Sequence, residues 1–156
     1  MTVSSSTSSV SYSGNGATTG FSYTFKIFAN SDLVVSLRDN ATGVSTTQTL
    51  TTDYTVSGAG SASGGTVTFV TAPASGKTVI IRRVLPYTQE TDYTENDPFP
   101  AAAHEDALDK LTMLTQQNRE EDAIKLPDGD VTSGVNNVTP NVVDRANTLL
   151  GFDATG

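Results

Sequence analysis

The residues best suited to chemistry are the adjacent His104, Glu105 and Asp106, because the chain has a single histidine and no cysteine. A histidine beside two carboxylates has the composition of an acid–base site. The surrounding sequence reads as a helix, in which adjacent residues point in different directions, so the three side chains do not converge on one substrate atom. A zinc site would need a second histidine at helical spacing. The pattern therefore favours a histidine at a surface or interface over catalysis.

Two other patterns could bind a ligand. Asp128-Gly129-Asp130 resembles the start of a calcium loop, but position 12 of that loop would be Thr139 in place of the glutamate that such loops need. The adjacent Arg82 and Arg83 could hold an acidic ligand. At the end of a strand they are more simply explained if one faces solvent and the other pairs with a nearby carboxylate. The sequence therefore predicts no catalytic, cofactor or metal site, and the chain is not expected to be an enzyme.

Aromatic residues gather in one early segment. They could form a sugar-binding platform, but their strand spacing is more typical of a core. This set comprises Phe21, Tyr23, Phe25 and Phe28.

Composition narrows the function classes further. The chain has 156 residues and a net charge of −8, which disfavours binding to nucleic-acid phosphates. The charge is uneven, since residues 1–89 hold five basic and three acidic side chains and residues 90–130 hold three basic and twelve acidic ones. The start of the chain lacks the basic and apolar regions of a signal peptide, and no apolar run is long enough to span a bilayer. The absence of cysteine fits folding in a reducing cytosol.

The elements that must position these residues are mostly strands. Residues 9–85 alternate apolar and polar side chains in about six or seven short runs separated by turn signals, which is typical of an antiparallel sandwich or barrel. Tyr54 and Val56 are the expected core contacts of one threonine-rich run. No alternation of strands with helices occurs, so a doubly wound fold is disfavoured. The predicted fold class is mainly β, with a sandwich-like domain, one amphipathic helix and an extended C-terminal linker.

The period changes to that of a helix after Pro100, a residue that suits a first helical turn. Ala107, Leu111, Leu114 and Asn118 form a narrow stripe, which Leu108 and Thr115 flank. A single helix of this length is not stable alone, so it must pack on the β-domain or on copies of itself, and the pattern leaves both open. An asparagine in such a stripe can fix the register of a helical bundle.

The expected organisation has four parts. Residues 1–8 form a flexible start and residues 9–89 the β-domain. Residues 90–125 hold the proline-bracketed segment and the helix, which serves trimerisation or docking. Residues 126–156 form a linker towards a distal fibre or spike region.

Several segments together resemble a known family. They are "VSYSGNGATTGFSYTFKIFANSDLVVSLRDNATG", "DYTV", "GTVTF", "GKTVIIRRVLPYTQETDY" and "FPAAAHEDALDKLTMLTQQ". Residues 9–123 are similar to the N-terminal attachment domain of tail fibres and tailspikes from T-seven-like podoviruses. The segments around Arg82-Arg83 and from Phe99 to Gln117 are the specific part of the match. The C-terminal "RANTLLGFDATG" is similar to the linker that follows this domain in many phage spikes.

The resemblance implies a structural virion protein of the tail fibre, made in the host cytoplasm. It implies a homotrimer whose N-terminal domains dock on the adaptor and nozzle proteins of the tail, while a distal region binds a host glycan or receptor. No contact with nucleic acid and no membrane insertion are expected, from the net charge and from the lack of a long apolar run. The residues expected at assembly interfaces are Phe99, Arg82, Arg83, Ala107, Leu108, Leu111, Leu114 and Asn118.

A stand-alone carbohydrate-binding or adhesin-like β-module is the alternative hypothesis, and a small hydrolase is a third. Binding of glycans by this chain alone would favour the carbohydrate-binding module, and glycan cleavage would favour the hydrolase.

Overall fold

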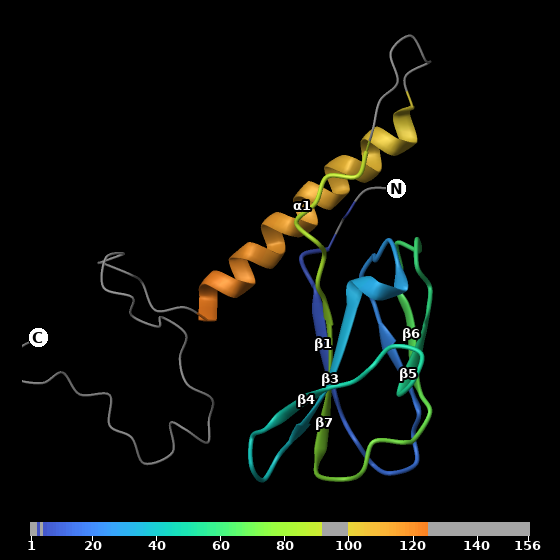
Figure 1. The fold of residues 1–156 in the computed structure, drawn as a ribbon, viewed down its shortest axis with the longest axis vertical. Coiled ribbons are helices and arrows are strands. Elements are labelled where there is room, and N and C mark those ends of the chain that lie inside the picture. The colour runs from blue at the N-terminus through green and yellow to red at the C-terminus, as the bar shows by residue number, and fades with distance from the viewer. Residues whose placement is uncertain (1–2, 4, 92–99, 125–156) are drawn as a thin grey trace, which may run out of the picture.

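Seven strands precede one long helix in the computed structural model, which describes residues 3, 5–91 and 100–124, with side chains up to Arg119 (Figure 1). The elements are β1 Ser9–Ser13, β2 Gly20–Tyr23, the 3-10 helix η1 Asn30–Asp32, β3 Leu33–Asp39, β4 Ser45–Thr47, β5 Tyr54–Ser57, β6 Gly65–Phe69, β7 Lys77–Arg83 and α1 Ala101–Ile124. The predicted Phe99 contact and the predicted linker 126–156 lie outside the described residues.

The strands form two antiparallel sheets. One has the order β1-β7-β3-β4 and the other the order β2-β6-β5. The longest pairing joins β3 and β7, from Leu33 opposite Arg83 to Asp39 opposite Lys77. The turn after β3 closes at Gly43, whose φ of 75° is the left-handed conformation that glycine adopts cheaply. The mainly β, antiparallel prediction is confirmed.

The core lies between the two sheets and uses the alternation that the sequence shows. Phe21 and Tyr23 point inward from β2, and Phe25 and Ile27 continue this alternation beyond the end of the strand. Tyr54 is 2% exposed, and Val56 packs against the same cluster. The interpretation of the aromatic segment as core is therefore confirmed for three of its four members, while Phe28 is half-buried near the surface. The remaining core side chains are Leu33, Val35, Val67, Phe69, Val79 and Ile81.

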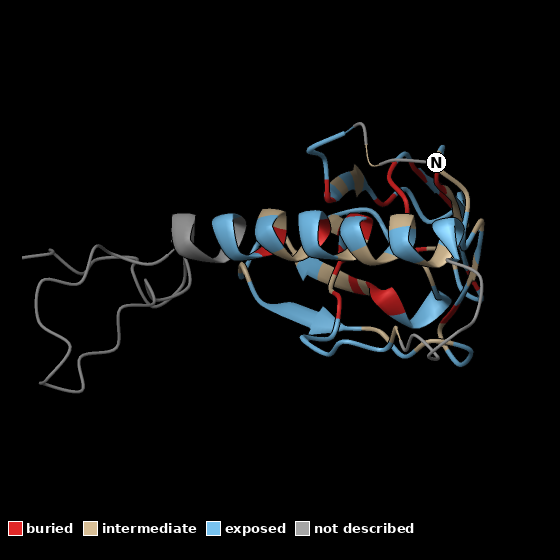
Figure 2. Cartoon of the chain, turned by 90° about the horizontal axis from the view of Figure 1, so that it is seen from above, coloured by how far each residue is buried: buried red, intermediate tan, exposed pale blue. Residues whose placement is uncertain are grey.

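Helix α1 lies across one end of the sheets, beside the segment that leads into β1 (Figure 1). It begins directly after Pro100, whose carbonyl accepts a hydrogen bond from the His104 N–H at 3.0 Å. Seen from above, its buried residues lie on the side turned towards the sheets (Figure 2). Within the described ranges, the structure holds no helix that is both long and apolar enough to cross a membrane.

Candidate assembly surface on the helix

The inner face of α1, which contacts the β-domain, is mostly polar. Asp109, Met113 and Gln117 recur every four residues, and their exposed fractions are 5%, 0% and 6%. Residues four apart share one face of a helix, so these three side chains form a continuous line against the domain. Met113 is the single apolar member of the line, so this face is held largely by hydrogen bonds and charge.

The centre of this contact is a buried lysine. The Lys26 ammonium lies 2.8 Å from Asp106 Oδ1 and 2.9 Å from Asp109 Oδ2, and Lys26 is 8% exposed. It also lies 4.8 Å from the centre of the Phe28 ring, which favours a cation. Burial alone would lower the pKa of Lys26, but the hydrogen bonds and charges of the two aspartates outweigh it, so the pKa is raised. The lysine is therefore held in its charged form.

Arg83 and two glutamines extend the contact. Arg83 is 3% exposed and donates to the Lys26 carbonyl at 3.2 Å and to Gln116 Oε1 at 2.7 Å. Gln117 accepts the Leu85 N–H at 2.8 Å and donates to the Leu85 carbonyl at 3.5 Å. Arg82, one position earlier on β7, is exposed, as the sequence predicts for one of the pair. The Arg83 guanidinium also lies 5.8 Å from the centre of the Phe25 ring, and its predicted pairing with a carboxylate stays a prediction.

The start of the chain is part of the same contact. The Val3 N–H donates to Asp109 Oδ1 at 3.0 Å, and Gln116 Nε2 donates to the Ser5 carbonyl at 3.1 Å. The Ser8 carbonyl then accepts the Arg83 N–H at 2.8 Å, next to the beginning of β1. The segment expected to be a flexible start thus binds both the helix and the end of β7. Asp109 is the residue that joins all three parts, because its two oxygens contact the N-terminal segment and Lys26.

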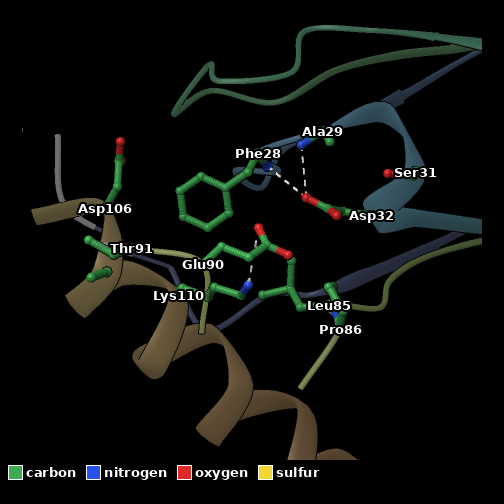
Figure 3. A pocket seen from close by; sticks show the side chains of 11 residues that line it. Phe28, Ala29, Ser31, Asp32, Leu85, Pro86, Glu90, Thr91, Asp106 and Lys110 are labelled. Carbon is green, nitrogen blue, oxygen red and sulfur yellow. Dashed lines mark hydrogen bonds and ion pairs between the residues drawn. The ribbon is translucent and has the colours of Figure 1, made fainter. Parts of the chain in front are cut away.

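A cavity of about 300 Å³ lies between α1, the turn before β3 and the segment after β7 (Figure 3). Each acidic side chain that lines it has a described partner. Asp32 Oδ2 accepts the N–H groups of Phe28 and Ala29, at 3.0 and 2.8 Å. Glu90 lies 3.7 Å from the Lys110 ammonium, and Asp106 pairs with Lys26. These contacts tie the helix, the turn before β3 and the segment after β7 around the cavity.

The outer face of α1 carries the large apolar side chains. Leu108 and Leu111 are 52% and 61% exposed, and Tyr87 beside them is 59% exposed. Together with Ala107 and Leu114 they line a shallow groove of about 390 Å³ between the helix and residues 87–91. The predicted stripe is thus turned away from the β-domain at Leu111 and Asn118 and half-buried at Ala107 and Leu114.

The residues singled out for chemistry do not form a reactive centre. His104 is exposed, while Asp106 binds Lys26 on the domain side of the helix. In the described part of the chain no group of three or more histidine or acidic side chains is placed to hold a metal ion.

Sequence reasoning missed Lys26, Asp109, Gln116 and Gln117. One feature of the sequence could have revealed this contact: Lys26 lies inside an aromatic strand pattern. A buried cation needs a partner, and the acidic helix supplies one.

This geometry describes a small β-domain with a helix fixed on it by polar contacts and with apolar side chains left on its outer face, as suits a structural module of a larger assembly. The family described as "Phage T7 tail fibre protein, N-terminal domain" matches residues 1–97. The chain belongs to this family, as the resemblance predicted, and its place is the tail of the virion.

A relative supports the assignment. The tail spike protein of Salmonella phage epsilon15 is 50% identical to this chain over 119 residues, which are 76% of the chain. The same residues are 11% of the relative, so the chain spans only a small part of that protein's length.

Proposed function

We propose that this domain anchors a tail fibre or tailspike to the virion tail and does so as a homotrimer without enzymatic activity. Its family is one of N-terminal domains, and the matching part of its relative is a small fraction of a much longer tail spike. The observation that carries the proposal is the outer face of α1, where Leu108 and Leu111 are exposed although the inner face of the same helix is tightly bound. Exposed apolar patches of this kind mark contact surfaces between proteins.

The proposed partners follow from this role. Other copies of the chain meet at the helix, and adaptor and nozzle proteins of the tail receive the β-domain. A distal region after the helix carries host recognition. The core burial of Phe21, Tyr23 and Phe25 leaves these rings unable to act as a sugar platform, which weighs against the carbohydrate-binding alternative.

Light scattering of the purified chain tests self-association and should report a trimer that dissociates on dilution. Leu111→Asp should weaken assembly without unfolding the domain, because the side chain is 61% exposed and a charge there opposes an apolar contact. Ala41→Asp is a matched control, since it adds the same charge in an exposed turn after β3. A Leu111→Asp chain that assembles normally, or a wild-type chain that forms a stable dimer, would contradict the trimer.

Anchoring is tested separately by competition. Virions lacking their own fibre or spike should take up the full-length protein, and an excess of this chain should block that uptake. Loss of the block in a variant with a disrupted β-domain is the expected control. Binding of the chain to a glycan array, together with no effect on uptake, would instead support the carbohydrate-binding module.

A further inference from the structure

Five side chains form a continuous line on the face of α1 that points away from the β-domain. Successive helical residues turn by about 100°, so Leu111 lies almost opposite Met113, which is fully buried against the domain. The line has spacings of four, three, four and three residues, all its members are exposed, and it is called here the outer seam. Its members are His104, Leu108, Leu111, Thr115 and Asn118. This alternating spacing, averaging about 3.5 residues, is the repeat that lets helices pack along a common line.

The charge of the outer seam restricts what can cover it. None of its members is a carboxylate, a lysine or an arginine, although the chain carries a net charge of −8. The carboxylates of Asp106 and Asp109 are drawn to the opposite side of the helix by Lys26. Copies of this acidic chain can therefore meet along the seam without opposing like charges. The groove beside the seam adds one carboxylate and one ammonium, Glu90 and Lys110, which lie 3.7 Å apart, so a basic partner would find no net counter-charge and the charge balance favours a second copy.

The polar members of the seam already have partners within the chain. The Thr115 hydroxyl donates to the Leu111 carbonyl at 2.9 Å, and Asn118 Oδ1 accepts the Tyr87 hydroxyl at 2.8 Å. A contact along the seam thus does not have to desolvate an unpaired threonine hydroxyl. The groove beside Tyr87 lies next to the two exposed leucines, so one face offers both projecting side chains and a hollow to receive them.

We infer that the outer seam packs against the same seam of other copies, with the helices parallel and in register. This inference rests on the proposed self-association and names the face and the direction of the contact. Leu108 and Leu111 then form two apolar layers and Thr115 and Asn118 form polar ones, and an asparagine layer is favourable in only one register. The parallel direction follows if all copies continue from the helix into one fibre, as the length of the relative suggests.

Disulfide cross-linking tests the inference cleanly, because the chain contains no cysteine. Single Leu111→Cys, Asn118→Cys and His104→Cys variants of the 156-residue chain are oxidised mildly and separated without reductant. A parallel register brings each position next to itself, so all three variants should yield covalent pairs, about tenfold more than the Ala41→Cys control. An antiparallel contact would bring Leu111 near itself but set position 118 against position 104.

Each outcome has a distinct meaning when light scattering accompanies the cross-linking. Covalent pairs of Leu111→Cys, with none of His104→Cys or Asn118→Cys, would contradict the parallel register. If the chain is a trimer but forms no covalent pairs at any of the three positions, the outer seam is not the contact between copies, while the proposed trimer is unaffected. A chain that stays monomeric at every concentration would contradict the proposed self-association itself.

Discussion

The two faces of α1 reverse the usual pattern of a surface helix. The inner face buries Asp109 and Gln117 with a single methionine between them, and the outer face exposes Leu108 and Leu111. A surface helix normally turns its apolar stripe to the core and its charges to water. Polar residues fix the helix on the domain, and the apolar residues on its outer face are the ones to which we assign the proposed contact with other copies.

Polar docking favours a single orientation. A buried ion pair adds little to stability, because desolvation cancels much of the attraction, but removing one partner is costly. Lys26 has two carboxylates within 3 Å, and shifting the helix by one turn would leave at most one of them beside it, because the two aspartates are about one turn apart. An apolar contact would tolerate such a shift more easily. The inner face therefore sets the direction in which the outer face is presented.

Asp109→Asn should be the most damaging change. It leaves the Lys26 charge buried with one fewer counterion, so the free energy of unfolding should fall by about 3 kcal/mol. Urea denaturation would measure the fall, and hydrogen exchange should show that the amides of α1 lose protection first. The matched control is Asp106→Asn, whose side chain is 56% exposed, and it should cost about 0.5 kcal/mol. If both variants lose the same free energy of unfolding, the burial of Asp109 does not make it more important than Asp106.

Truncation of the apolar side chains compares the faces directly. Met113→Ala should lower the free energy of unfolding by about 2 kcal/mol, because it leaves a cavity under the helix. Leu108→Ala should lower it by less than about 0.5 kcal/mol, since that side chain is 52% exposed. Thermal unfolding at low protein concentration, where copies are apart, would measure both. A larger loss at Leu108 than at Met113 would reverse the assignment of the faces.

Alkaline pH should weaken the contact between the inner face and the β-domain. The pKa of Lys26 is raised above its ordinary 10.5, so its contribution is complete below that pH and is lost as the pH rises through the folded value. Burial also raises the pKa of Tyr23 and Tyr54 above 10.0, which acts in the same direction. Stability measured in urea should therefore fall above about pH 10. Lys26→Arg, which keeps its charge at these pH values, should reduce the slope, and an unchanged slope would exclude Lys26 as its cause.

Tyr87→Phe should have the smallest effect. It removes the hydrogen bond to Asn118 at a side chain that is 59% exposed, so the free energy of unfolding should change by about 0.5 kcal/mol. Its effect on assembly is expected to be larger than its effect on stability, because the freed asparagine would be left without this partner beside the seam. Sedimentation would separate the two effects.

The β-domain could be predicted from the sequence because its burial follows a period of two. Phe21, Tyr23 and Tyr54 lie in the core as expected, and the sheets are antiparallel. The aromatic segment from Phe21 to Phe28 has strand spacing throughout, but the strand ends at Tyr23 in the structure, although the inward alternation continues to Ile27. Alternation reports burial, whereas the extent of a strand depends on which neighbour supplies its hydrogen bonds.

The inner face of α1 could not be found in this way. Asp109 and Gln117 are residue types that normally face water, and their burial is favourable only because distant residues supply partners: Lys26, 83 residues from Asp109, and the Leu85 backbone for Gln117. A pattern search along the helix therefore selects the leucines and misses the face that holds the helix. The packing of Leu111 and its neighbours on other copies stays a prediction.

The contact between the chain's start and its helix also sets an order of events during synthesis. Val3 and Asp109 are 106 positions apart, and Ser5 and Gln116 are 111 apart, so both bonds wait until nearly the whole helix has been made. Contacts this distant in sequence form late, because a long loop must close first. The β-domain can fold before them, while Lys26 still lacks its carboxylates. The helix is then oriented last, so the proposed contact between copies would form only after each β-domain is in place.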